Sequence, residues 1–127
     1  MRPETLLDFM GVAEHLKCNM RHSRMTDHRR ESVAEHTYRL CVFAWLVKEE
    51  FPDCDMDKVM KMCLFHDLGE ALTGDIPAFV KTDDDRKTEG DALTLLTAML
   101  PGKERQELDE LFGELEREET MEAKIVH

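Results

Sequence analysis

Three residues with metal-binding side chains, His36, His66 and Asp67, are the part of this sequence best suited to chemistry. His66 and Asp67 are adjacent within an apolar stretch, and His36 lies in another. Imidazole nitrogen and carboxylate oxygen suit zinc, manganese, iron or cobalt, whereas a calcium site would be almost entirely oxygen. A lone histidine is more often a hydrogen-bonded core residue, but several such groups buried together need a compensating cation. The pattern therefore predicts one divalent metal ion, from among Mn, Co, Zn, Fe, Ni and Mg.

Two further carboxylates follow the His-Asp pair. Glu70 comes four residues after His66 and three after Asp67, so on one continuous helix the three side chains would project to the same side. Asp75 lies in the segment Gly74–Pro77, which leaves the helix in an extended turn. Its carboxylate could fold back over the metal or cap the turn, and the local sequence slightly favours the cap.

Composition indicates a single domain. The chain has 127 residues with 42% hydrophobic content, enough for one core. No apolar run approaches the ~18 residues that a membrane-spanning helix needs, and the N-terminus lacks a signal-peptide pattern. None of the four cysteines forms a C-x-x-C pair, which favours free thiols in a reducing compartment. We therefore expect a cytoplasmic protein with no membrane partner.

The charge distribution favours a small anionic ligand. A net charge of −11 argues against a nucleic-acid polymer as the main partner, because phosphate-backbone binding needs a basic surface. Basic residues nevertheless cluster just before His36, at Lys17, Arg21, Arg24, Arg29 and Arg30. The alternative is an ordinary solvated loop. Beside a metal motif, the cluster indicates a small phosphorylated substrate.

The elements that must position these residues are all predicted to be helical. Apolar spacing predicts a first helix from about Glu4 to about Cys18. A capping box begins a second at Ser32, which runs to about Glu50, and its segment Leu40–Val47 is apolar on almost every side. We therefore expect this second helix to be the central, buried one, with His36 facing inward.

Three more helices follow in the prediction. The third begins near Asp55 or Asp57 and ends around Leu72, so that it carries the His-Asp pair and Glu70. After a polar connection at 82–87, two amphipathic helices are centred on 92–99 and 108–115, separated by Pro101-Gly102. No β-alternation of useful length is present. The fold class predicted is all-α, a compact bundle with the metal between the helices that carry His36 and His66-Asp67.

The C-terminal residues predict a short last helix. Thr120 can cap it, but the sequence stops about two turns later at His127, and so short a helix would be marginal. We expect residues 1–127 to form a single domain that lacks its C-terminal helices.

These motifs together resemble the HD-domain metal-dependent phosphohydrolases. The segments Arg30–His36, Phe65–Glu70 and Thr73–Pro77 look most like the branch that contains the bacterial 5′-deoxynucleotidases and related hydrolases. The cyclic-dinucleotide phosphodiesterase branch would have Lys in place of Glu70, and the guanosine-tetraphosphate hydrolase branch would have Glu-Asp in place of Glu70-Ala71. The chain departs from the deoxynucleotidases at His22, where they carry Trp.

The resemblance implies roles for the candidate residues. It makes His36, His66 and Asp67 metal ligands, Glu70 and Asp75 catalytic or supporting carboxylates, and Arg21 a phosphate contact. The family's fourth ligand is an aspartate expected a few residues after Val126, beyond the end of this sequence.

The implied activity is hydrolysis of 5′-(deoxy)nucleoside monophosphates or similar small phosphate esters, and proteins of this branch tend to form homodimers. The competing hypothesis is a catalytically silent HD module that binds nucleotide or metal for regulation. Retention of Glu70 and Asp75 favours the enzyme.

Overall fold

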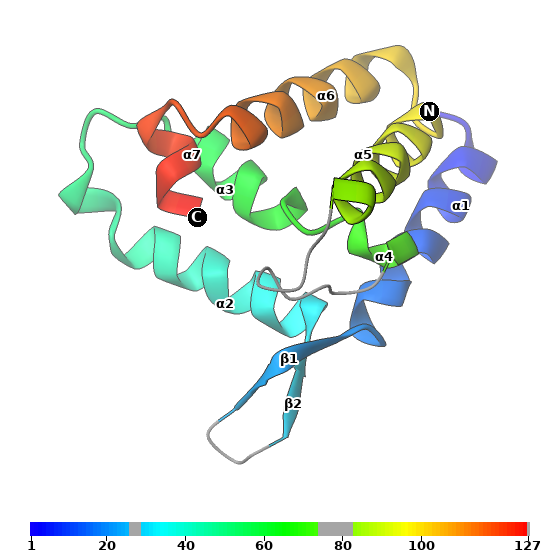
Figure 1. The fold of residues 1–127 in the computed structure, drawn as a ribbon. Coiled ribbons are helices and arrows are strands. Elements are labelled where there is room, and N and C mark those ends of the chain that lie inside the picture. The colour runs from blue at the N-terminus through cyan, green and yellow to red at the C-terminus, as the bar shows by residue number, and fades with distance from the viewer. Residues whose placement is uncertain (26–28, 74–82, 127) are drawn as a thin grey trace.

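The computed structural model describes residues 1–25, 29–73 and 83–126, and these form a helical bundle with one small hairpin (Figure 1). The elements are α1 (Pro3–Glu14), η1 (His15–Lys17), β1 (Met20–Arg24), β2 (Arg30–Ser32), α2 (Val33–Leu46), η2 (Lys48–Glu50), α3 (Met56–Phe65), α4 (Glu70–Thr73), α5 (Asp83–Ala98), α6 (Gly102–Arg117) and α7 (Met121–Val126). The predicted all-α class is confirmed.

The core forms where α3 packs between α2 and the C-terminal helices. Figure 1 shows α2 and α3 on facing sides, α6 across the top, and α1 beside α4 at the opposite end from α7. Val59, Met62 and Cys63 of α3 are completely buried, as are Val33 and Ala44 of α2. This packing holds α2 against α3, the two helices from which the candidate metal ligands come.

The predicted capping box at the start of α2 is present. The Ser32 hydroxyl accepts a hydrogen bond from the Glu35 backbone N–H at 3.1 Å, and the Glu35 carboxylate accepts one from the Ser32 N–H at 2.9 Å. These bonds satisfy two N–H groups that a helix start leaves unpaired. The first turn of α2, which carries His36, is thereby fixed.

The prediction that α2 is the central, buried helix is wrong. One side packs against α3 through Val33, Thr37 and Ala44, whereas Phe43 is 53% exposed and Leu46 65% exposed. The apolar run Leu40–Val47 cannot reveal this, because neighbours on only one side of a helix cover only one of its faces.

The third helix ends earlier than predicted. α3 stops at Phe65, and 66–69 form turns in which Leu68 N–H bonds Phe65 C=O and Glu70 N–H bonds Asp67 C=O, both at 3.0 Å. Bonds to the third residue back wind the chain more tightly than an α-helix. His66, Asp67 and Glu70 therefore do not share one continuous helix face, contrary to the prediction.

The hairpin was not predicted at all. β1 and β2 pair antiparallel with Met20 opposite Ser32 and Arg24 opposite Arg30, and Val33 N–H bonds Asn19 C=O at 2.8 Å where the pair joins α2. Its strands are short and polar, without the apolar alternation that identifies strands in sequence. The hairpin brings Arg21 beside the start of α2.

The C-terminal half follows the prediction except at the start of α5. α5 begins at Asp83, inside the segment expected to be a polar connection. α7 has the predicted cap, with the Ala123 N–H donating to the Thr120 hydroxyl at 3.2 Å, and it buries Ala123 and Val126. Packing against α3 therefore supports a helix that its length alone would leave marginal. Among the described residues, no helix is long and apolar enough to cross a membrane.

Candidate metal centre

The structure brings His36, His66 and Asp67 together. His36 comes from the first turn of α2, and His66 and Asp67 follow the last residue of α3. One possible ligand atom from each residue lies within 4.8 Å of the other two, and the described residues contain no other such cluster of three. The His66 Nε2–Asp67 Oδ2 distance is 2.9 Å, and the His36 Nε2–Asp67 Oδ2 distance is 3.7 Å.

The backbone at the end of α3 orients the His66 ring. Its Nδ1 lies 2.8 Å from the carbonyl oxygen of Cys63, so Nδ1 carries the proton and donates. Metal-bound histidines usually donate their second ring N–H in this way, which fixes the ring and leaves the other nitrogen for the ion. His66 Nε2 is therefore the atom directed at Asp67 and available to a metal.

His36 is held from the other side by an ion pair. Arg21 Nη1 donates to Glu31 Oε1 at 3.0 Å and lies 3.0 Å from His36 Nδ1, while Glu31 Oε1 is 3.8 Å from the same nitrogen. The Glu31 side chain is only 11% exposed. Arg21 and Glu31 thus lie on the Nδ1 side of the His36 ring, whereas Asp67 lies on the Nε2 side.

Burial and charge shift the pKa values of the three groups in different directions. Burial, and then the charge of Arg21, lower the pKa of His36. Burial would also lower the pKa of His66, but its hydrogen bond to Asp67 and the charge of that carboxylate outweigh burial and raise it. Burial would raise the pKa of Asp67, yet the hydrogen bond with His66 and the nearby positive charges lower it overall. The Asp67 carboxylate is therefore held in its ionised form beside the two imidazole rings.

The donor set fits a divalent transition metal. Two atoms bonded to one ion at ~2.1 Å are roughly 3 to 3.5 Å apart at common coordination angles, close to the His66–Asp67 and His36–Asp67 separations. The side chains are 14–24% exposed, so an ion can reach them. Two neutral imidazoles and one carboxylate favour zinc, iron, cobalt or manganese over calcium.

The other candidate residues are placed less directly. Glu70 begins α4 and is not part of the three-residue cluster, while its backbone carbonyl accepts a hydrogen bond from the Asn19 side chain at 2.5 Å. Asp75 lies outside the described residues. Arg21 lies beside His36, on the Nδ1 side of its ring, and its role as a phosphate contact stays a prediction. Glu31 was missed by the sequence reasoning, although it lies within the Arg30–His36 motif and its carboxylate could have been read as a partner for the preceding arginines.

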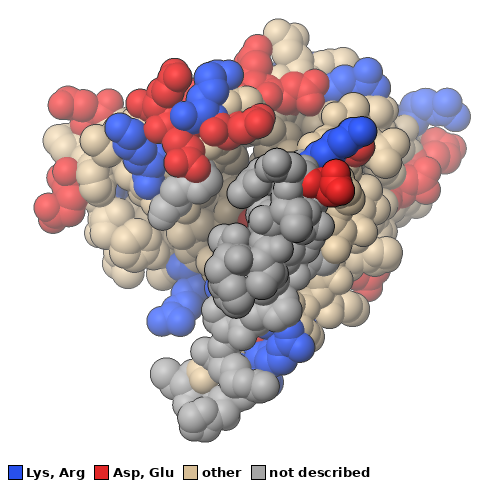
Figure 2. Space-filling view, viewed as in Figure 1, with Lys and Arg blue, Asp and Glu red and all other residues tan. Residues whose placement is uncertain are grey.

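Two residues of the basic cluster, Arg21 and Arg29, pair with neighbouring carboxylates. Arg29 Nη2 donates to Glu35 at 2.6 Å, Arg21 pairs with Glu31, and Arg30 Nε donates to the Arg21 carbonyl at 3.0 Å. In Figure 2, acidic side chains gather along the upper edge with several basic ones among them, and further basic side chains stand lower, toward the hairpin.

Comparison with known proteins agrees with this site. The HD-domain family model matches residues 13–127. The human 5′-deoxynucleotidase HDDC2 is 36% identical over 100 residues, covering 77% of this chain and 48% of that protein. Its Xenopus laevis counterpart is 33% identical over 128 residues, covering 97% of this chain and 62% of its own length. The chain therefore spans about half the length of the curated relatives it matches.

Solved structures show the same fold. A predicted metal-dependent phosphohydrolase from Magnetospirillum magnetotacticum superposes with a TM-score of 0.88 at 29% identity, over 98% of this chain and 64% of that one. A conserved hypothetical protein from Pyrococcus furiosus gives a TM-score of 0.77 at 30% identity, over 94% and 69% of the two chains.

Proposed function

Because this chain belongs to the HD-domain family, we propose that it is a metal-dependent phosphohydrolase that acts on 5′-nucleoside monophosphates, deoxynucleotides included. The observation that carries the proposal is the convergence of His36, His66 and Asp67 from two helices, with an arginine behind them. The names of the curated relatives support a phosphate monoester as the substrate.

Each residue has a proposed part in the reaction. His36, His66 and Asp67 would hold one divalent ion, which when bound lowers the pKa of a water molecule and polarises a phosphoryl oxygen. Three protein ligands leave positions open for water and substrate. Arg21 would offset phosphate charge, since guanidinium donors match phosphate oxygens.

The carboxylates would move protons. Glu70 starts the helix that directly follows the His-Asp turn, and Asp75 comes shortly after it in the sequence. We assign to them the tasks of orienting the attacking water and protonating the leaving 5′ oxygen. A divalent ion of the Mn, Co, Zn, Fe, Ni or Mg group, a cytoplasmic location and a homodimer complete the proposal, and the free cysteines support the location.

The direct test is phosphate release from a panel of 5′-ribo- and deoxyribonucleoside monophosphates with added manganese or cobalt. We expect turnover in the parent protein and none after Asp67→Ala, which removes a ligand. Lys103→Ala on α6 is a matched surface control and should turn over normally. Equal rates in the Asp67 variant and the parent would refute metal-assisted hydrolysis. Absence of turnover across a broad phosphate-ester panel would favour the regulatory module instead.

A further inference from the structure

Asn19, the only asparagine in the sequence, lies at the base of the hairpin and bonds to two helices that are far from each other in the sequence. Its backbone C=O accepts a hydrogen bond from the N–H of Val33, at the start of α2, at 2.8 Å. Its side-chain amide donates to the backbone carbonyl oxygen of Glu70, the first residue of α4, at 2.5 Å. This half-buried residue therefore connects α2 with α4.

The connection reaches from Glu70 to the helix that carries His36. Val33 and His36 both lie at the start of α2. Glu70 is also bonded to the other segment of the metal cluster, because its N–H donates to the Asp67 C=O at 3.0 Å. The first residue of α4 is thus tied to the His-Asp turn by the turn itself, and to α2 through Asn19.

α4 needs contacts of this kind because it has only four residues, Glu70–Thr73. A helix this short has too few internal hydrogen bonds to hold its own conformation. α5 packs against this region, where a Cβ added at Gly69 would lie 3.1 Å from Leu93 Cδ2. The bond from Asn19 holds the first residue, so its loss would let the Glu70 backbone shift relative to the metal cluster.

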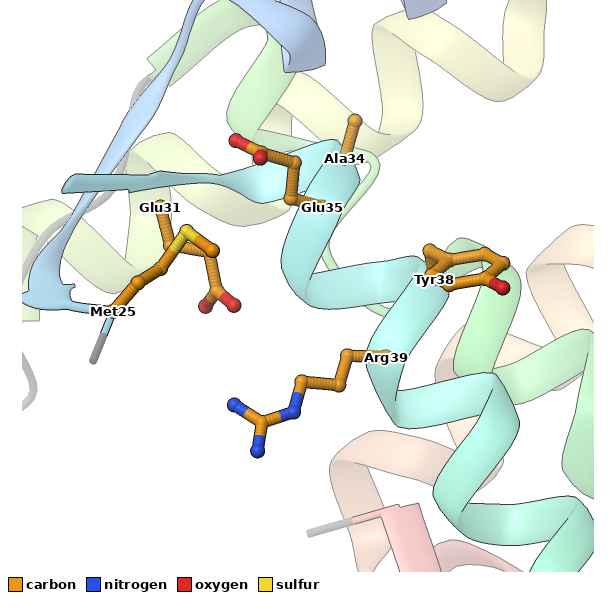
Figure 3. A pocket seen from close by; sticks show the side chains of 6 residues that line it. All are labelled: Met25, Glu31, Ala34, Glu35, Tyr38 and Arg39. Carbon is orange, nitrogen blue, oxygen red and sulfur yellow. The ribbon is translucent and has the colours of Figure 1, made fainter. Parts of the chain in front are cut away.

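The base is the part of the hairpin that is best anchored to α2. There, the link is the backbone hydrogen bond between Asn19 and Val33. Farther along, Arg29 and Glu35 form an exposed ion pair, and Met25 and Glu35 help to line an open pocket of about 430 Å³ (Figure 3). The side-chain bond to α4 therefore comes from the well-anchored end of the hairpin.

We propose that Asn19 is a positioning residue for the hydrolysis, which holds Glu70 in a set position relative to the metal cluster. The inference rests on the proposed function, in which Glu70 moves protons. Asn19 acts through Glu70 rather than through contact with substrate or metal. An amide suits this task because its NH₂ group donates, whereas an aspartate of the same size would turn a carboxylate oxygen toward the Glu70 carbonyl.

Steady-state kinetics of Asn19→Leu test the assignment, since leucine has nearly the shape of asparagine but no donor. With 2′-deoxyadenosine 5′-monophosphate and Mn²⁺, kcat should fall about 10- to 100-fold while KM stays within twofold. A small displacement of a reacting group can cost ~10²-fold in rate. The affinity for Co²⁺ should also stay within twofold. An unchanged kcat, or Co²⁺ binding that weakens in step with kcat, would overturn the proposal.

Combining Asn19→Leu with Glu70→Ala separates positioning of Glu70 from a general effect on the fold. If Asn19 acts through Glu70, the double variant should turn over within twofold of Glu70→Ala alone, whereas losses that multiply would overturn the proposal. Arg105→Ala is the matched control, because the Arg105 guanidinium also donates to backbone carbonyls, those of Thr97 and Ala98 at the end of α5. It should keep the parental kcat, and an equal fall there would likewise count against a specific role for Asn19.

Hydrogen exchange in the metal-free protein gives a readout that needs no activity. The N–H groups of Leu72 and Thr73 in α4 bond the Gly69 C=O at 3.1 and 3.3 Å. Asn19→Leu should speed their exchange roughly tenfold relative to amides of α6, the size expected from one lost hydrogen bond. Unchanged exchange would overturn the proposal. Faster exchange in a protein whose parent hydrolyses no phosphate ester would refute the hydrolase while showing that Asn19 sets the position of Glu70.

Discussion

Replacing Glu31 with glutamine would test how His36 is prepared for a metal ion. Arginine cannot accept a hydrogen bond, so His36 Nδ1, 3.0 Å from Arg21 Nη1, must act as the acceptor in this arrangement. The ring proton then lies on Nε2, the nitrogen that faces Asp67. Binding a metal through Nε2 requires the proton on Nδ1, and the Glu31 carboxylate, 3.8 Å away, must move closer to accept it.

The magnitude follows from the two contacts of Glu31. Loss of an outer carboxylate that orients a ligating histidine typically lowers metal affinity ~10- to 100-fold. Without metal, the variant keeps an oxygen that can accept from Arg21 but loses its charge, and a hydrogen bond to a charged group is ordinarily worth about 1.5–3 kcal/mol against about 1 kcal/mol for a neutral one. Because the Arg21 side chain is 30% exposed, solvent screening reduces the difference to about 1 kcal/mol of unfolding free energy.

The assay is isothermal titration of the metal-free protein with Co²⁺, together with urea unfolding of the same samples. Glu35→Gln is the matched control. Glu35 lies on the same turn of α2 as His36 and pairs with Arg29, but among the described side chains it has no contact with His36. It should keep parental metal affinity. A Glu31→Gln protein that binds Co²⁺ within twofold of the parent would refute the reasoning about the His36 proton.

Three further expectations follow from the same structure. Glu70→Ala should keep its metal while turnover falls ~10²- to 10⁴-fold, as for a lost acid–base group, and metal content that fell in step with activity would make Glu70 a ligand. Met62→Ala should lower the unfolding free energy by about 2–5 kcal/mol in urea titrations, because Met62 is completely buried, and a smaller loss would mean that the core collapses around the gap. The hydrogen bond from Arg29, aided by Ser32, lowers the pKa of Glu35 from 4.5 to about 2. The ionised carboxylate therefore stabilises the fold above pH 4.5, and this contribution is lost as the pH falls toward 2. Glu35→Gln should flatten the change in melting temperature across that pH range, and parallel curves for variant and parent would contradict the assignment.

Local signals predicted the parts of the fold that local contacts determine. Ser32 and Glu35 form the capping box that their spacing indicated, and Thr120 caps α7. The meeting of His36 with His66-Asp67 was predicted because histidines on inward-facing, apolar helical stretches need a shared partner. Their roles as ligands stay predictions, as do those of Glu70, Asp75 and Arg21 and the fourth ligand expected after His127.

Contacts between distant segments explain what the sequence could not predict. The break after Phe65 coincides with a close approach to α5, where a Cβ added at Gly69 would lie 3.1 Å from Leu93 Cδ2. Helical periodicity gives no sign of such a contact. The polar hairpin is likewise held by contacts between segments, namely the pairing of β1 with β2 and their junction with α2. These contacts place Arg21 of β1 beside His36 of α2.

The most direct test of the central claim is anomalous scattering from crystals of the protein grown with Mn²⁺ or Co²⁺, with elemental analysis of the same preparation. The account predicts one ion per chain, about 2.0–2.2 Å from His36 Nε2, His66 Nε2 and an Asp67 oxygen, and its loss in Asp67→Ala. A parent protein in which these atoms stay more than ~4 Å from any ion at saturating metal would contradict it.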